Sequence, residues 1–144
     1  MTNTREMLEA SPIAVPLDVG EVAAVIDACS SCVQACTSCA DADLAEQEVH
    51  ELRTCVALCL NCADLCDLTA RLLSRSAHWD NVLVHPVLQA CRRACTTSAE
   101  ECARHAEHHR HCAVCEKVCR ACVAACSALL DAEVFAEVQR LAGG

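Results

Sequence analysis

The segment CSSCVQACTSC, residues 29–39, decides the fold of this chain because its four cysteines follow one another at intervals of three and four residues. Such intervals place side chains on one face of an α-helix. The same spacing recurs in CVALCLNCADLC (55–66), CRRACTTSAEEC (91–102) and CAVCEKVCRACVAAC (112–126). The sequence therefore predicts helices whose inward stripe consists of thiols instead of the usual Leu, Ile and Val.

The cysteines of these stripes are predicted to line the core and to bind metal. They are Cys29, Cys32, Cys36, Cys39, Cys55, Cys59, Cys62, Cys66, Cys91, Cys95, Cys102, Cys112, Cys115, Cys119, Cys122 and Cys126. Large core side chains are scarce, since the 144 residues include one Phe, one Trp and no Tyr. A free cysteine packs as a small hydrophobic residue, so the thiols can form the core before any metal binds.

Capping signals set the boundaries of the first two predicted helices. Asp18 with Glu21, and Asp43 with Glu46, have the spacing of capping boxes. The sequence has no Gly or Pro between residues 21 and 85, which suits long helices. The predicted helices span about 18–41 and 43–74.

The second pair of helices is separated by a turn that the cysteine phase reveals. Pro86 suits the first turn of a helix over about 86–107, although Asp80 could cap an earlier start and leave Pro86 as a kink. A single straight helix from there to residue 130 would rotate the cysteine stripe by roughly 80–100° between Cys102 and Cys112. A turn near His108 is the simpler account, and it places the fourth helix over about 110–130.

Four helices with short connections pack as an antiparallel up-down-up-down bundle. We therefore predict an all-α fold with a cysteine-lined core over residues 18–131. Residues 1–17, with Pro12 and Pro16, are expected to form an extended N-terminal arm. Residues 132–144 are expected to form a short C-terminal helix and tail.

Charge and hydropathy exclude several classes of partner. A formal net charge of −9 argues against nucleic acid, whose binding needs a basic face. No run approaches the roughly 18 apolar residues of a membrane span, and Arg5, Glu6 and Glu9 interrupt any signal peptide. We expect a cytoplasmic protein with reduced thiols. A disulfide scaffold is also disfavoured because cysteines one turn apart on a helix have Cβ vectors that do not converge.

Thiolates bind soft metal ions, and the charge of a filled core separates the candidates. Four Zn²⁺ ions on sixteen thiolates would leave eight uncompensated negative charges inside the bundle, whereas sixteen Cu(I) ions would leave none. Uncompensated charge in a low-dielectric interior is very costly. The sequence therefore favours storage or buffering of multiple Cu(I) ions, at about one ion per thiolate.

Two alternatives use the same residues differently. A general soft-metal buffer or detoxification protein would hold zinc or cadmium on these thiolates. An iron–sulfur or thiol redox protein is disfavoured, because the ferredoxin cysteine run is absent and a thioredoxin-type CxxC follows a strand. The sequence offers no nucleophile–base pair, phosphate-binding loop or paired carboxylates, so we expect no enzymatic activity.

The repeated CxxC and CxxxC ladders on four helices over residues 18–130 resemble the cytosolic bacterial copper storage proteins. The resemblance implies a homotetramer of four-helix bundles, each filled with Cu(I) ions on cysteine thiolates, and storage without chemical turnover. It is consistent with a copper chaperone as partner. Ser98 departs from the pattern, since it lies midway between Cys95 and Cys102 where the ladder would place a thiol. We expect Ser98 to lower local capacity or to divide the metal into clusters.

Antiparallel packing gathers histidines at the end with the first and third turns. His105 follows Cys102 by three residues and His108 precedes Cys112 by four, which puts both on the stripe. The less well aimed candidates are His109 and His111. We predict that copper is taken up through these four imidazoles, which pass it to Cys39, Cys102 and Cys112.

The opposite end is predicted to be a dry plug. Its residues are Val22, Val25, Thr69, Leu73, Val87, Leu88, Leu129 and Leu130. The remaining histidines, His50, His78 and His85, are expected at the surface.

Overall fold

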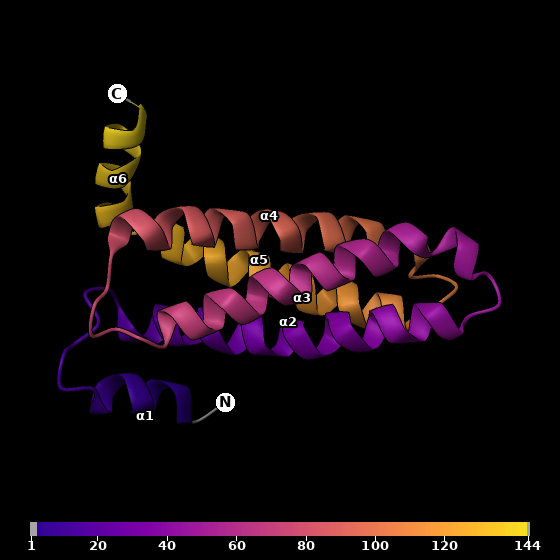
Figure 1. Ribbon diagram of the computed structural model, residues 1–144, viewed down its shortest axis with the longest axis horizontal. Helices are drawn as coiled ribbons and strands as arrows, with labels where there is room; N and C mark the ends of the chain where they lie inside the picture. The colour runs from indigo at the N-terminus through magenta and orange to yellow at the C-terminus, as the bar shows by residue number, and fades with distance from the viewer. Residues whose placement is uncertain (1–2, 144) are drawn as a thin grey trace.

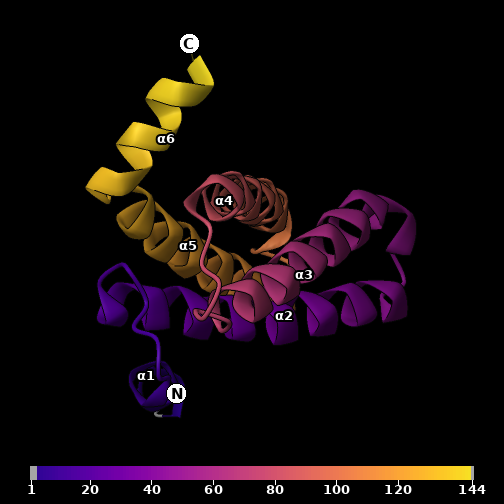
Figure 2. The ribbon, with the colours of Figure 1, turned by 60° about the vertical axis from the view of Figure 1, so that its left-hand side comes forward.

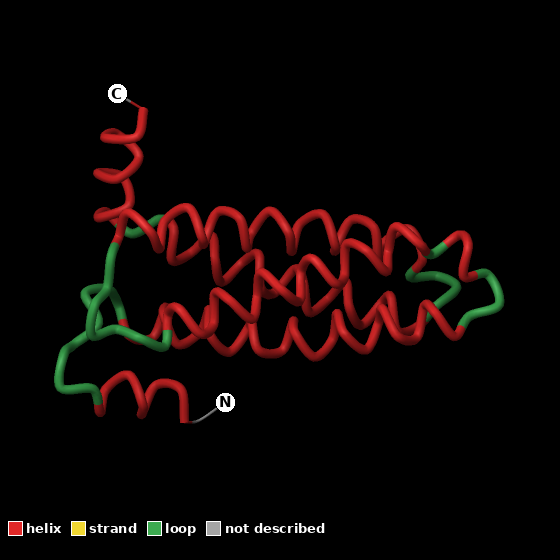
Figure 3. Tube along the Cα trace, in the orientation of Figure 1, coloured by secondary structure: helices red, strands yellow, loops and turns green. Residues whose placement is uncertain are grey.

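The computed structural model describes residues 3–143, which are helical apart from short connections and contain no strand (Figures 1 and 3). The helices in this range are α1 (Asn3–Ala10), α2 (Val19–Ala45), the 3-10 helix η1 (Val49–Glu51), α3 (Arg53–Leu73), α4 (Asn81–His105), α5 (Arg110–Leu130) and α6 (Glu133–Gly143). The long helices α2 to α5 run antiparallel and pack as a four-helix bundle (Figure 1). The predicted fold class is confirmed.

The cysteine stripes of α2 to α5 all face the bundle axis. Every cysteine is buried, with an exposed fraction of at most 1%. The small thiol and alanine side chains leave little apolar volume along the axis, so larger residues fill one end. The fully buried residues there are Val22, Val25, Thr69, Leu73, Leu88 and Leu129. Val84 is buried beside them, whereas the predicted Val87 and Leu130 are only partly buried.

The first turn of the bundle comes later in the chain than predicted. Asp18 caps α2 as expected, its side chain accepting a hydrogen bond from the backbone N–H of Glu21. Asp43, however, is not a cap, because α2 continues through it to Ala45. Asp43 follows Cys39 by four residues and is buried on the same inward face. The chain turns only after this packed face ends, and α3 begins at Arg53.

Helix α4 begins at Asn81, five residues before Pro86, so the earlier of the two starts that the sequence allows is the one observed. The side chain of Asp80 caps it by accepting from the backbone N–H of Val82. Pro86 removes one helical donor, but Val84 and Leu88 are buried on either side of it and hold this turn in the bundle. Capping and burial together outweigh the lost hydrogen bond.

The predicted extended arm is wrong for residues 3–10, which form α1. Leu8 of α1 is buried, and Thr4 Oγ1 donates a hydrogen bond to Asp27 Oδ1 at 2.5 Å, so the helix packs on the outer side of α2 (Figure 2). The segment NTREMLEA has no helix breaker, whereas Pro12 and Pro16 follow it. The prolines therefore end the helix instead of extending the whole arm.

Helix α6 leaves the bundle beside the end of α4 (Figure 2). Its one buried residue is Phe135, whose ring lies 5.4 Å from that of His85, centroid to centroid. His85 is therefore buried, contrary to the prediction of a surface position, because α4 begins early and α6 covers it. His50 and His78 are exposed as predicted.

Helix α2 is long and apolar enough to cross a membrane by length and composition alone, contrary to the expectation that no segment comes near this limit. Half of its apolar window is buried inside the protein. Its cysteines and valines face the other three helices of the bundle, as the core helix of a globular domain does.

Replacing Phe135 with Ala should lower the free energy of unfolding by about 3 kcal/mol or more, because the substitution empties a fully buried aromatic site. Urea unfolding of the reduced, metal-free protein, followed by circular dichroism, measures this. Leu141→Ala on the same helix is the control, since Leu141 is 71% exposed and its loss should change stability by less than about 0.5 kcal/mol. Equal effects of the two substitutions would contradict the assigned role of Phe135.

Candidate metal centre

The thiols of the four helices touch one another across the axis. Sγ–Sγ distances between contacting cysteines are 3.5 to 4.0 Å, as for Cys62 and Cys95 at 3.5 Å and Cys29 and Cys122 at 3.6 Å. A disulfide has a sulfur–sulfur distance near 2.05 Å. These cysteines are therefore free thiols in van der Waals contact, which places many soft donors at metal-bridging separations.

The sulfurs group into overlapping sets of four whose donor atoms lie within 4.8 Å of one another. All-sulfur sets include Cys29, Cys66, Cys91 and Cys122; Cys32, Cys66, Cys95 and Cys122; Cys32, Cys36, Cys62 and Cys119; and Cys39, Cys59, Cys102 and Cys115. The first three sets share sulfurs, and the fourth is joined to them by contacts such as that of Cys36 with Cys115 at 3.6 Å. The sulfurs therefore form a continuous column.

Ser98 occupies the one level of the column at which α4 contributes no thiol to a four-sulfur set. Its side chain is fully buried, and its Oγ lies 3.6 Å from Cys119 Sγ, 3.8 Å from Cys59 Sγ and 3.9 Å from Cys36 Sγ. The sulfurs continue past it only through α2, α3 and α5, for example by the 3.6 Å contact of Cys36 with Cys115. At this level the column therefore lacks a thiol from α4, as the position of Ser98 in the sequence suggested.

Hydrogen bonds between neighbouring thiols shift their pKa values in opposite directions. Those from Cys39 and then Cys55 lower the pKa of Cys112, while hydrogen bonds with Cys102 and then Cys112 raise the pKa of Cys55. A thiolate surrounded by S–H donors is stabilised, and its neighbours keep their protons more firmly. Soft metal ions displace these protons when they bind.

A mixed set of donors closes the sulfur column at the end where α2 turns into α3 and α4 into α5. Cys39, Asp43, His111 and Cys112 place their donor atoms within 4.8 Å of one another. His111 Nδ1 lies 3.5 Å from Cys39 Sγ, 3.6 Å from Cys112 Sγ and 3.5 Å from Asp43 Oδ1. Sulfur, imidazole nitrogen and a carboxylate oxygen therefore converge on one point at the end of the core.

Asp43 is a candidate ligand that the sequence analysis missed. It is fully buried, and its Oδ2 has no hydrogen-bond partner among the described residues. Burial raises the pKa of Asp43 to about 6, although a hydrogen bond with Cys55 opposes this rise. Its position four residues after Cys39 continues the cysteine spacing of α2 and could have indicated an inward-facing side chain. The sequence analysis assigned Asp43 to a capping box instead.

One carboxylate, that of Glu46, partners two histidines at this end. Glu46 Oε2 lies 2.8 Å from His111 Nε2 and 2.7 Å from His109 Nδ1. Burial alone would lower the pKa of His111, but the hydrogen bond to Glu46 and the nearby charges of Cys112, Asp43 and Glu46 together outweigh it, and the pKa is raised. The hydrogen bond from His111 in turn lowers the pKa of Glu46. The pair is charge-complementary at the mouth of the column.

The histidines that lie nearest the mixed donor set are not the two predicted from helical phase. His111 joins the mixed donor set, and His109 shares the carboxylate of Glu46. His105 Nε2 lies instead 2.9 Å from the carboxylate of Glu101, and His108 is exposed. Phase failed here because His108 and His109 lie in the turn between α4 and α5, where no helical period applies.

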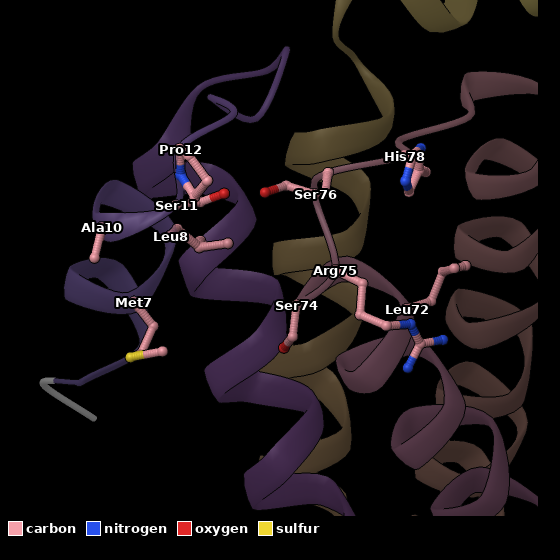
Figure 4. Close-up of a pocket in the computed structure, with 11 residues that line it drawn as sticks. Met7, Leu8, Ala10, Ser11, Pro12, Leu72, Ser74, Arg75, Ser76 and His78 are labelled. Carbon is pink, nitrogen blue, oxygen red and sulfur yellow. The ribbon is translucent and has the colours of Figure 1, made fainter.

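A surface pocket lies away from the sulfur column, at the apolar end of the bundle (Figure 4). Its volume is about 640 Å³, and it is formed between α1 and the connection from α3 to α4. Met7 and His78 line it together with serine and alanine, but no cysteine does. This pocket lacks the cluster of thiolates that the metal chemistry requires.

Comparison with known proteins places this arrangement in a family. The sequence profile of the copper storage proteins matches residues 19–131, which span the whole bundle. The chain belongs to the copper storage protein family. The resemblance predicted from the cysteine ladders is confirmed.

Solved copper storage proteins share this fold closely. The copper storage protein Ccsp from Streptomyces lividans, loaded with 10 copper equivalents, superposes with a TM-score of 0.87 at 42% identity, covering 88% of this chain and 97% of Ccsp. The cytosolic copper storage protein from the same organism with five coppers gives 0.78 at 45% identity, covering 78% and 94%. The uncharacterized cysteine-rich protein YhjQ of Bacillus subtilis (strain 168) is 31% identical over 106 residues, 74% of this chain and 93% of YhjQ.

Replacing Asp43 with Asn should stabilise the metal-free protein near neutral pH, by no more than about 3 kcal/mol. Below about pH 3 the carboxyl is mostly protonated in both the folded and the unfolded chain. As the pH rises, the unfolded chain ionises first, because its pKa is near 3.8 while the folded value is about 6. Wild-type stability is therefore lost between these values, whereas the amide does not titrate.

Thermal unfolding of both reduced proteins between about pH 4 and pH 7 measures the difference. Asp41→Asn, two residues earlier and exposed, is the matched control. A constant gap between wild type and Asp43→Asn across this range would refute the assignment.

Proposed function

We propose that this protein stores Cu(I) in the cytoplasm, holding many ions per chain on the thiolates of its core. The observation that carries the proposal is the continuous column of buried, mutually contacting thiols from all four helices. The copper-loaded Ccsp structures support it, because they are related copper storage proteins with the same bundle. Copper is the cargo of the protein, and storage requires no chemical turnover.

Charge favours monovalent copper over divalent zinc or cadmium. Three of the four-sulfur sets have no cysteine in common, so a few divalent ions could each find four thiolates, but each such site would keep two uncompensated negative charges. Cu(I) is a soft ion suited to thiolate, and one positive charge per thiolate neutralises the core. Neutrality is decisive in a dry interior.

The two ends of the column suggest a direction for copper traffic. Apolar residues such as Val22, Leu73 and Leu129 seal one end. The other end carries the mixed donors, and the side chain of His111 is 25% exposed there. Copper would bind first at the imidazoles, pass to Cys39 and Cys112, and move inward by exchange between adjacent thiolates. Each transfer displaces a thiol proton towards the polar end.

Association into a homotetramer and delivery by a copper chaperone complete the proposal. The outer faces of the bundle helices expose large apolar side chains, including Leu60, Leu68 and Val114. Such residues support contacts between copies of the chain. A protein described as cytosolic among the similar structures supports a cytoplasmic location, where the thiols stay reduced.

Anaerobic titration of the reduced protein with Cu(I) against a strong chelator should give about sixteen tightly held ions per chain, one per thiolate. Metal analysis after gel filtration counts the ions. Parallel titrations with Zn²⁺ and Cd²⁺ should saturate at far fewer, because charge accumulates in the core. Fewer than about eight Cu(I) ions would overturn the proposed storage function.

Replacing Ser98 with Cys should raise the capacity by about one Cu(I) ion, because the new thiolate would restore the missing α4 ligand between Cys36, Cys59 and Cys119. The same titration measures it. Ser98→Ala serves as the control and should leave the count unchanged if the hydroxyl is not a ligand. A lower capacity in Ser98→Ala would instead assign Ser98 to the copper site.

A further inference from the structure

One carboxylate oxygen at the polar end contacts two imidazole rings through different nitrogens. Glu46 Oε2 lies 2.8 Å from Nε2 of His111 and 2.7 Å from Nδ1 of His109. The two rings lie side by side with centroids 5.5 Å apart and planes inclined by 30°. Glu46 follows the last residue of α2, while His109 and His111 lie at the start of α5. The contact therefore joins two helices at the mouth of the column.

The chemistry of a carboxylate fixes where the protons are. An ionised carboxylate only accepts hydrogen bonds, so the contacting nitrogen of each ring carries the hydrogen. A neutral imidazole has one N–H, and its other nitrogen holds a free lone pair. The lone pair is then on Nδ1 in His111 and on Nε2 in His109.

The remaining contacts of His111 agree with this assignment. Its Nδ1 is 3.5 Å from both Cys39 Sγ and Asp43 Oδ1, and 3.6 Å from Cys112 Sγ. Its contact with Glu46 is shorter by 0.7 Å than that with Asp43. The stronger acceptor therefore takes the Nε2 hydrogen, and Nδ1 is left facing the thiols and the buried carboxylate.

We propose that Glu46 is a positioning residue that imposes opposite tautomers on two neighbouring histidines, Nδ1–H on His109 and Nε2–H on His111. Each ring thereby has its ligand nitrogen set before copper arrives: Nε2 in His109 and Nδ1 in His111. A carboxylate behind a ligating histidine also fixes the ring orientation and raises its basicity. The proposal rests on the proposed copper function for its purpose, but the tautomers are a property of the metal-free protein.

Nitrogen-15 NMR of the reduced, metal-free full chain at about pH 8, with labelled histidine, tests the tautomers directly. Long-range proton–nitrogen correlations distinguish Nδ1–H from Nε2–H in each ring. Wild type should show opposite tautomers at His109 and His111. The same tautomer in both rings would overturn the proposal, whatever the copper capacity of the protein.

Variants of Glu46 separate positioning from a purely structural role. Glu46→Ala should release His109 from its Nδ1–H form and slow uptake of the first Cu(I) equivalents by roughly tenfold. The saturation count should stay within about one ion of wild type, since the thiols are untouched. Glu46→Gln offers one carbonyl acceptor and should restore the tautomer of one ring at most. Glu48→Ala, exposed two residues later, is the matched control.

The outcomes separate the two levels of the proposal. A wild type that binds few copper ions but shows opposite tautomers sinks the storage function and leaves the positioning role intact. Normal loading with unchanged tautomers and uptake rate in Glu46→Ala sinks the positioning role alone. Melting curves of each variant show whether the fold is kept, and the wild-type spectrum decides the tautomers without any variant.

Discussion

Contact between buried thiols is the constraint on which the rest of this structure depends. Sulfurs 3.5 to 4.0 Å apart leave room neither for large side chains nor for water along most of the axis. Small side chains at these positions let four helices approach closely, but they also remove much of the apolar area that normally stabilises a bundle. Most of the large buried residues therefore lie near one end, at Leu73, Leu88, Leu129 and Phe135, whereas Leu52 is buried beside the turn at the other end.

The two ends of the bundle therefore differ in the side chains that they bury. The apolar end carries the packing and is covered by α6, whereas the other end carries polar groups whose burial has a cost. Asp43 shows that cost most clearly, with one carboxylate oxygen lacking a partner among the described residues. A buried oxygen without a partner is destabilising in the metal-free protein. The same oxygen is free to interact with a cation that binds at this end. The polar end is therefore built for binding at the expense of stability.

The column between the ends is continuous but not uniform. Ser98 is as fully buried as the cysteines, so the packing of the bundle is kept at this position. What changes is the donor atom, since a hydroxyl oxygen replaces a sulfur. The neighbouring sulfurs of Cys36, Cys115 and Cys119 keep the path connected on the other side of the axis. Migration of a soft ion along the core is thus confined there to three helices.

The sequence by itself determined the helices, their inward faces and the family, because intervals of three and four residues fix which side chains share a face. It also located the cap at Asp18 and the departure at Ser98. Periodicity does not state where a helix begins or ends, so α1 and the continuation of α2 through Asp43 were missed, and two starts for α4 were left open. Only the tertiary structure decided that His111 and not His108 faces Cys39, and that Glu46 reaches two imidazoles. Those contacts join residues more than 60 positions apart, and their geometry depends on how two helix ends meet in space.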